Sequence, residues 1–120
     1  MMGHYILENG QAVPCTDIHK WAAWYEDSMH ERHVGDDEID GYRVSTVFLG
    51  LDHNFGGGAP LIYETMIFCE GPLNSWMARY STWTQAEAGH QKVLDAIRYG
   101  RVGDLLTDAE RIRDLLTDGD

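Results

Sequence analysis

Two apolar runs, at residues 42–51 and 61–69, form the longest hydrophobic region of the chain, and a glycine-rich connection joins them. Both runs are rich in β-branched and aromatic residues, whose stiff side chains fit a pleated strand better than a helix. Each run has strand length and is bounded by Gly or Pro. Apolar side chains fall on both faces of the first run, so the pattern predicts a central hairpin with at least part of each face covered.

A second hairpin is predicted near the N-terminus, because Asn9-Gly10 between two apolar runs favours a type I′ turn. A helix should follow over residues 18–32, with Thr16 or Asp17 as its N-cap. Its apolar residues recur at i, i+3 and i+4, which is the spacing of an amphipathic helix packed on a core.

The segment at residues 35–41, GDDEIDG, is acidic, bounded by glycine and almost free of apolar side chains, so an exposed loop is expected there. It lacks the ligand spacing of an EF-hand loop, and the pattern supports at most loose cation binding. Its carboxylates are instead candidates for binding a partner: Asp36, Asp37, Glu38 and Asp40.

A second long helix is predicted after a short strand at residues 76–80, with Ser81 or Thr82 as its N-cap, and Thr82 and Gln85 form a capping-box pattern. Tyr99-Gly100 should end this helix. His90 falls within its apolar stripe, where a lone histidine is more often a hydrogen-bonded core residue than a catalyst.

The predicted order of elements is ββ-α-ββ(β)-α followed by a short C-terminal helix, which is an α+β fold. We expect a mainly antiparallel sheet of about four to five strands with two main helices packed on it. Residues 1–100 should form a single domain, and residues 101–120 an acidic helical tail that docks on the core or on another copy of the chain.

Composition limits the classes of function. At 120 residues the chain is long enough for one domain with a sizeable core. It has no apolar run of about 20 residues, so no transmembrane helix is expected. The first residues lack a signal-peptide pattern, so a cytoplasmic location is expected, in the host cell if the protein is phage-encoded. Cys15 and Cys69 are then expected as reduced thiols.

The formal net charge is −11, which opposes direct binding to nucleic acid phosphates or to anionic membranes. It favours a protein partner with a basic surface, and an acidic surface can imitate a nucleic acid backbone. No cofactor is expected. Homo-oligomerisation through the C-terminal helix is a further expectation.

The residues that look most chemical lie around the glycine-rich connection: Asp52, His53, Glu64 and His90, with Tyr63 and Ser45 as helpers. Glu64 shares a strand face with apolar residues, so it needs a partner or a shifted pKa. A His–carboxylate pair there could act as general base and orienter. Asp52, His53 and His90 could alternatively bind a divalent metal. The structural alternative is that Glu64 ties the hairpin together through Arg43 or His53.

Other candidate binding residues flank this cluster. Gly56, Gly57 and Gly58 let the backbone approach a ligand closely, and Asn54 precedes them. No Lys and no following helix accompany the glycines, so a phosphate cradle is excluded and a flexible hairpin loop is favoured. Trp24, beside the apolar stripe of the first helix, is either core or an aromatic platform for a ligand or partner.

Five segments carry a resemblance to a known family: WAAWYE at residues 21–26, RVSTVFLGLDHNFGGG at 43–58, YETM at 63–66, RYSTW at 79–83 and EAGH at 87–90. Over about three-quarters of its length the chain resembles a family of small uncharacterised proteins of bacteriophages and prophages. The resemblance implies phage or prophage origin and no particular activity.

Three hypotheses about function follow. The first is a non-enzymatic interaction protein that acts on a host nucleic-acid-binding or defence protein. The second is a small enzyme or a ligand- or metal-binding protein with its site at the loop of residues 52–58. The third is a virion assembly component. The acidic charge and the lack of a nucleophile motif such as GxSxG favour the first.

Overall fold

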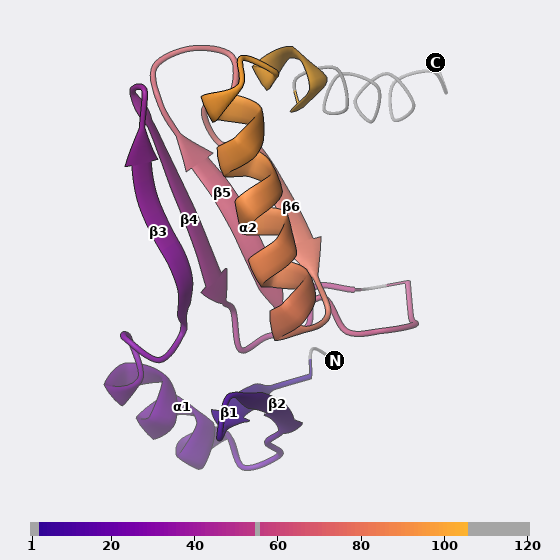
Figure 1. Cartoon of the computed structure of the whole chain (residues 1–120). Helices are drawn as coiled ribbons and strands as arrows, with labels where there is room; N and C mark the ends of the chain where they lie inside the picture. Colours follow the sequence, from indigo (N-terminus) through magenta and orange to yellow (C-terminus); the bar gives the residue numbers. More distant parts are fainter. Residues whose placement is uncertain (1–2, 55, 106–120) are drawn as a thin grey trace.

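The computed structural model describes residues 3–54 and 56–105 of the chain. Its elements, drawn in Figure 1, are β1 (Tyr5–Glu8), β2 (Gln11–Pro14), α1 (Ile18–Asp27), β3 (His33–Ile39), β4 (Tyr42–Phe48), β5 (Tyr63–Phe68), β6 (Met77–Tyr80) and α2 (Trp83–Arg98). The strands form a two-stranded sheet, β1-β2, and a four-stranded sheet in the order β3-β4-β5-β6, with every pairing antiparallel. The predicted α+β class is confirmed.

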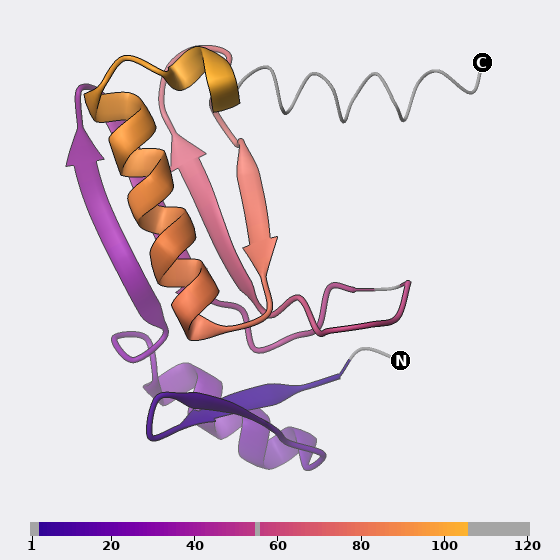
Figure 2. The same cartoon turned by 45° about the vertical axis from the view of Figure 1, so that its right-hand side comes forward.

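Helix α2 covers one face of the four-stranded sheet, as Figures 1 and 2 show. Burial alternates along β4 and β5, because every second side chain of a strand points to the same face. The buried side chains of this face and of α2 make two apolar clusters. One includes Val44, Ile67, Val93, Leu94 and Ile97. The other includes Phe48, Ile62, Tyr63 and Ala86.

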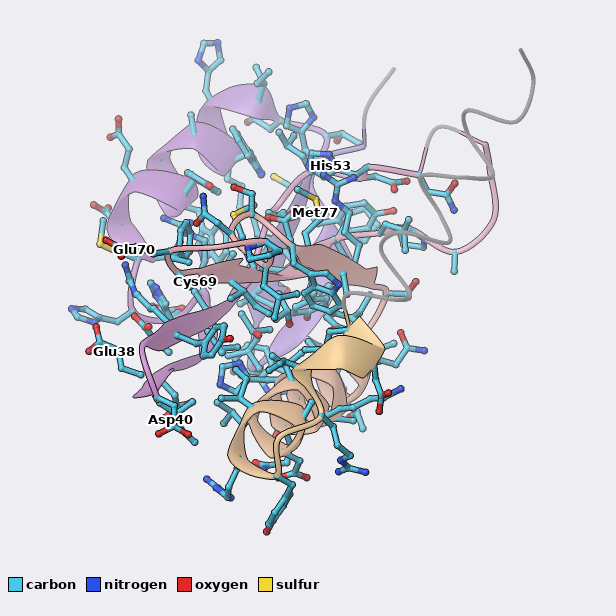
Figure 3. The ribbon with its side chains drawn as sticks, turned by 90° about the horizontal axis from the view of Figure 1, so that it is seen from above. Glu38, Asp40, His53, Cys69, Glu70 and Met77 are labelled. Atoms are coloured by element: carbon cyan, nitrogen blue, oxygen red, sulfur yellow. The ribbon has the colours of Figure 1, made fainter. Side chains whose placement is uncertain are left out.

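The other face of the sheet is more exposed. Phe68 and Met77 keep 42% and 44% of their surface in contact with solvent, and Figure 3 shows Met77 on the side away from α2. Helix α1 and the β1-β2 sheet lie beyond one end of the four-stranded sheet (Figure 1). Of the two helices expected to cover the sheet, α2 does so, whereas α1 packs on β1.

Local signals explain where most elements begin and end. Asn9 and Gly10 both have positive φ, at 52° and 78°, as a type I′ turn requires. The Asp17 carboxylate accepts hydrogen bonds from the amides of His19 and Lys20 and so caps α1. The Thr82 hydroxyl caps α2 by accepting from the Gln85 amide, as predicted.

Helix α1 ends at Asp27, although the apolar spacing predicted a helix to residue 32. The chain turns at Ser28, which is buried. Arg32 then folds back, with its guanidinium 3.7 Å from the centre of the Tyr25 ring and donating to the Tyr25 carbonyl at 3.2 Å. These contacts redirect the chain so that β3 can begin at His33.

The acidic segment at residues 35–41 is not a loop, and that prediction is wrong. It forms most of β3 and the turn to β4, where Asp40 and Gly41 have φ of 50° and 84°. An edge strand tolerates this composition because one side of its backbone faces solvent and its charged side chains stay hydrated.

The chain still packs on the core after residue 100. Leu105 is buried in the α2 cluster, and its carbonyl accepts a hydrogen bond from the Trp76 indole at 3.2 Å. The rest of the predicted terminal helix, residues 106–120, lies outside the described residues, so docking or self-association through it stays a prediction. Among the residues described, no helix has the length and apolar character needed to cross a membrane.

Candidate functional site

The four residues predicted to form a catalytic cluster are not brought together. Glu64 forms an ion pair with Arg79 on the neighbouring strand, at 3.0 Å, and not with Arg43, His53 or His90. Its neighbours Tyr63 and Thr65 are buried toward α2, so Glu64 points to the opposite face. The four-stranded sheet therefore separates Glu64 from His90, which lies on the buried side of α2.

Asp52 and Asn54 hold the shape of the loop at residues 52–60. One Asp52 carboxylate oxygen accepts hydrogen bonds from the amides of Asn54 and Leu61, at 2.8 and 3.0 Å. The Asn54 amide group donates to the Ala59 carbonyl and accepts from the Gly56 amide. The polar side chains proposed to bind a ligand are thus engaged with the loop's own backbone, as in an ordinary hairpin connection.

The glycines of this loop serve its conformation. Gly57 and Gly58 have φ of 85° and 94°, a region that side-chain-bearing residues rarely adopt. The metal prediction also fails, since no group of three or more His, Cys, Asp or Glu within the described ranges is arranged to hold an ion. Asp52, His53 and His90 therefore do not form a ligand set.

Trp24 belongs to the core. Its ring packs edge-on against Phe48 with the centroids 5.8 Å apart, and it joins the cluster that includes Leu7 and Tyr63. Tyr63 itself is 1% exposed, and burial raises the pKa of its hydroxyl. Neither aromatic residue is available as an exposed platform or as a catalytic helper.

His90 instead takes part in a chain of polar side chains between α2 and the sheet, which the sequence reasoning missed. His90 Nε2 lies 2.7 Å from Asp37 Oδ2, and Nδ1 lies 2.6 Å from Thr46 Oγ1. The Thr46 and Thr65 hydroxyl oxygens are 2.6 Å apart. The Tyr80 hydroxyl donates to Thr65 at 3.1 Å and completes the chain. We call these five residues the polar chain.

The hydrogens of the polar chain can be assigned in one consistent direction. Asp37, as a carboxylate, offers only acceptors, so His90 Nε2 donates to it and Nδ1 accepts from Thr46. The Thr46 hydroxyl then accepts from Thr65, and Thr65 accepts from Tyr80. Burial raises the pKa of Tyr80, partly offset by the bond to Thr65, so the phenol keeps the proton that it donates. Every buried side-chain nitrogen or oxygen atom of these five residues thus has a hydrogen-bond partner.

A carboxylate–imidazole–hydroxyl sequence is also the connectivity of a hydrolase triad. Here the hydroxyl belongs to Thr46, which has no exposed surface, so no substrate carbonyl can approach it. The polar chain therefore holds the edge strand β3 and helix α2 to the centre of the sheet. Two glycines make room for it: a Cβ at Gly35 would lie 2.6 Å from His90 Nε2, and one at Gly89 would overlap the Tyr80 hydroxyl.

The carboxylates of β3 and the β3–β4 turn are of two kinds, those bound to other side chains and those that are not. Asp36 makes a two-pronged ion pair with Arg43, at 3.1 and 3.0 Å, and Asp37 serves the polar chain. Glu38 and Asp40 are exposed and engage in no hydrogen bond or salt bridge with any described residue. Glu38 lies opposite Arg43 and interacts with its charge, but neither carboxylate is hydrogen-bonded to a described residue. These two carboxylates are therefore the ones available to a partner.

A hollow of about 480 Å³ lies at the same end of the sheet. Its walls come from the β3–β4 turn and the end of β5: Glu38, Ile39, Asp40, Gly41, Tyr42, Arg43 and Phe68. Figure 3 shows Glu38 and Asp40 at one side of the molecule, well apart from His53. The hollow combines the carboxylates of Glu38 and Asp40 with the Phe68 ring, and the Arg43 guanidinium lies 5.6 Å from the centre of that ring. A cationic side chain would therefore be attracted to the carboxylate side of the hollow.

The Asp36–Arg43 pair gives a testable electrostatic result. Hydrogen bonding from Arg43 holds the pKa of Asp36 below its ordinary value of 3.8. Since the folded state has the lower pKa, the pair stabilises the fold above the ordinary pKa and loses this effect as the pH falls through the lower folded value. In Arg43→Met the pKa of Asp36 should rise toward 3.8 in a carboxyl-carbon NMR titration. In Arg79→Met it should stay low, and equal values in both variants would contradict the assignment.

Comparison with protein-family models, with curated proteins and with solved structures finds no match for this chain. The resemblance to phage proteins therefore stays a prediction, and the function has to be argued from the geometry of the site.

Proposed function

We propose that the protein is a non-enzymatic interaction module that binds a basic surface of another protein through β3 and the β3–β4 turn. The observation that supports this most directly is the pair of exposed carboxylates, Glu38 and Asp40, beside the hollow. Asp36 and Asp37 lie on the same strand, so four carboxylates make the electrostatic potential around β3 and its turn negative. A basic partner would be attracted to this edge at long range and held there at contact.

The enzyme alternative has lost its geometric support. Glu64 and His90 lie on opposite faces of the sheet, Asp52 is engaged by loop amides, and the hydroxyl of the triad-like chain is buried. An interaction protein needs none of these groups to meet. It only needs α2 and the sheet to hold β3 and the β3–β4 turn in a fixed position on the surface.

Nucleic-acid-binding proteins are the partner class that we propose, including those of a host cell. Their binding surfaces carry Lys and Arg arranged to contact phosphates. The carboxylates of β3 can bind the same Lys and Arg side chains in place of nucleic acid phosphates. Binding of this kind weakens as salt concentration rises, because exposed charges are screened.

The test uses a panel of purified nucleic-acid-binding domains with pI above about 9 as probes in biolayer interferometry. The site variant is Glu38→Lys with Asp40→Asn, which keeps a residue suited to positive φ at position 40. The control variant is Glu26→Lys with Asp27→Asn, at exposed positions of α1. Both variants change the net charge equally. We expect the site variant to weaken binding at least about tenfold, and the control to weaken it about twofold or less.

Equal losses in the two variants would mean that net charge alone causes the binding, and would overturn the proposal. Absence of binding to any domain of the panel would overturn the proposed partner class. Circular dichroism and thermal melting should show both variants folded, because neither pair of positions contributes to the core.

A further inference from the structure

Strand β3 is an edge of the four-stranded sheet, with β4 on one side and no strand of the described residues on the other. The Phe48 amide donates to the Arg32 carbonyl, and the two-residue turn joins Ile39 to Tyr42. Because hydrogen-bonded and non-hydrogen-bonded residue pairs alternate along an antiparallel ladder, these contacts determine which β3 residues form main-chain hydrogen bonds with β4. Gly35, Asp37 and Ile39 direct their main-chain groups toward β4.

Asp36 and Glu38 consequently direct their main-chain N–H and C=O groups outward. Within residues 3–54 and 56–105, no other segment bonds to these groups. An edge with free donors and acceptors is a template for an added strand. The side chains of the same two residues lie on the sheet face opposite α2, together with Arg43 and Phe68.

The negative charges of β3 and its turn determine which kind of strand can pair with β3. A second copy of the chain would bring Asp36, Asp37, Glu38 and Asp40 against the same four residues, and like charges on paired strands repel. A strand with alternate Arg or Lys residues would bring opposite charges together. The hollow at the turn then receives one long cationic side chain beside the carboxylates of Glu38 and Asp40.

We propose that the partner contributes an extended basic segment that adds antiparallel to β3 as a fifth strand of the sheet. This proposal rests on the proposed function and specifies how the partner binds. Directly opposite residues of an antiparallel pair share a face. The partner residues opposite Asp36 and Glu38 therefore place their basic side chains on the face opposite α2 and direct their own amides toward β3.

The experiment uses a synthetic peptide of about ten residues in which Arg and Val alternate. One version carries N-methyl groups on the Arg amides, and the matched version carries them on the Val amides. Affinities are measured by isothermal titration calorimetry, and amide exchange of the protein by NMR. Methylation on Arg should weaken binding by about tenfold or more, whereas methylation on Val should change it little. The amides of Asp36 and Glu38 should exchange more slowly in the complex.

Equal affinities of the two methylated peptides, or unchanged exchange at Asp36 and Glu38, would overturn strand addition. Failure of the unmodified peptide to bind at about 1 mM would overturn it as well. The proposed function would survive these results if the Glu38→Lys, Asp40→Asn variant still lost its protein partner selectively. If that variant kept the partner, the proposed function itself would fail.

Discussion

Gly89→Ala should destabilise the protein by about 2 kcal/mol or more, although the same substitution in an exposed helix interior usually stabilises by up to about 1 kcal/mol. The sign changes because Gly89 lies in α2 directly over Tyr80. A methyl group there would overlap the Tyr80 hydroxyl oxygen and the adjoining ring carbon. Either α2 lifts from the sheet or Tyr80 leaves the polar chain, and both outcomes expose buried groups.

Urea unfolding measures the effect. The control is Gly103→Ala, because an added Cβ at that position meets no atom of residues 3–54 or 56–105 within 4 Å. The stability of this variant should stay about equal or rise slightly. In a Tyr80→Ala background, Gly89→Ala should cost much less, since the hydroxyl oxygen and the ring carbons that the methyl group would overlap are gone. A stabilised Gly89→Ala protein would contradict the packing of α2 on Tyr80.

Thr46→Val should cost about 3 kcal/mol, because it leaves two buried polar groups without a partner, each at roughly 1–3 kcal/mol. The side chains of Thr and Val have nearly the same shape, so the change removes the hydroxyl without creating a cavity. His90 Nδ1 loses its donor and the Thr65 hydroxyl loses its acceptor. The polar chain is broken at its fully buried centre.

Thr46→Ser is the matched control, since it keeps the hydroxyl and should cost about 1 kcal/mol for the lost methyl. In the unmodified protein, ¹⁵N NMR of His90 should show the hydrogen on Nε2, the tautomer assigned from the hydrogen-bond network. A Thr46→Val protein as stable as the original, or His90 with its only ring hydrogen on Nδ1, would contradict the assigned direction of the chain.

Much of the fold is predictable from the sequence because the signals are local. Asn9-Gly10 specifies its turn through φ, and Thr82 with Gln85 specifies the start of α2 through capping. The apolar stripe that contains His90 was read correctly, and His90 is indeed a buried, hydrogen-bonded residue. The turn, the helix cap and the apolar stripe depend on residues within a few positions of each other.

The acidic strand was missed because its stability comes from pairing and not from propensity. Asp and Gly are poor strand formers, and the sequence of β3 resembles a loop until β4 is placed beside it. The Asp36–Arg43 ion pair and the hydrogen bond that His90 donates to Asp37 then compensate for the poor propensity. Arg43 lies seven positions from Asp36, on the next strand, but His90 lies 53 positions from Asp37.

The candidate catalytic site failed for a related reason. Periodicity showed that Glu64 shares a face with Met66 and Phe68, but not that this face lies away from α2. The polar chain joins residues up to 53 positions apart, such as Asp37 and His90. One local hint existed, because Thr46 and Thr65 stand among the apolar residues of two central strands, where buried hydroxyls need partners.

Hydrogen exchange of the complex measures directly whether β3 and the β3–β4 turn form the binding surface that we propose. Mass spectrometry would compare the free protein with the protein saturated by the tightest-binding basic domain of the panel. We predict slower exchange in peptides that cover residues 33–43, with little change in α1 or in residues 52–60. Protection confined to residues 52–60 or to α1, with β3 unchanged, would contradict the account.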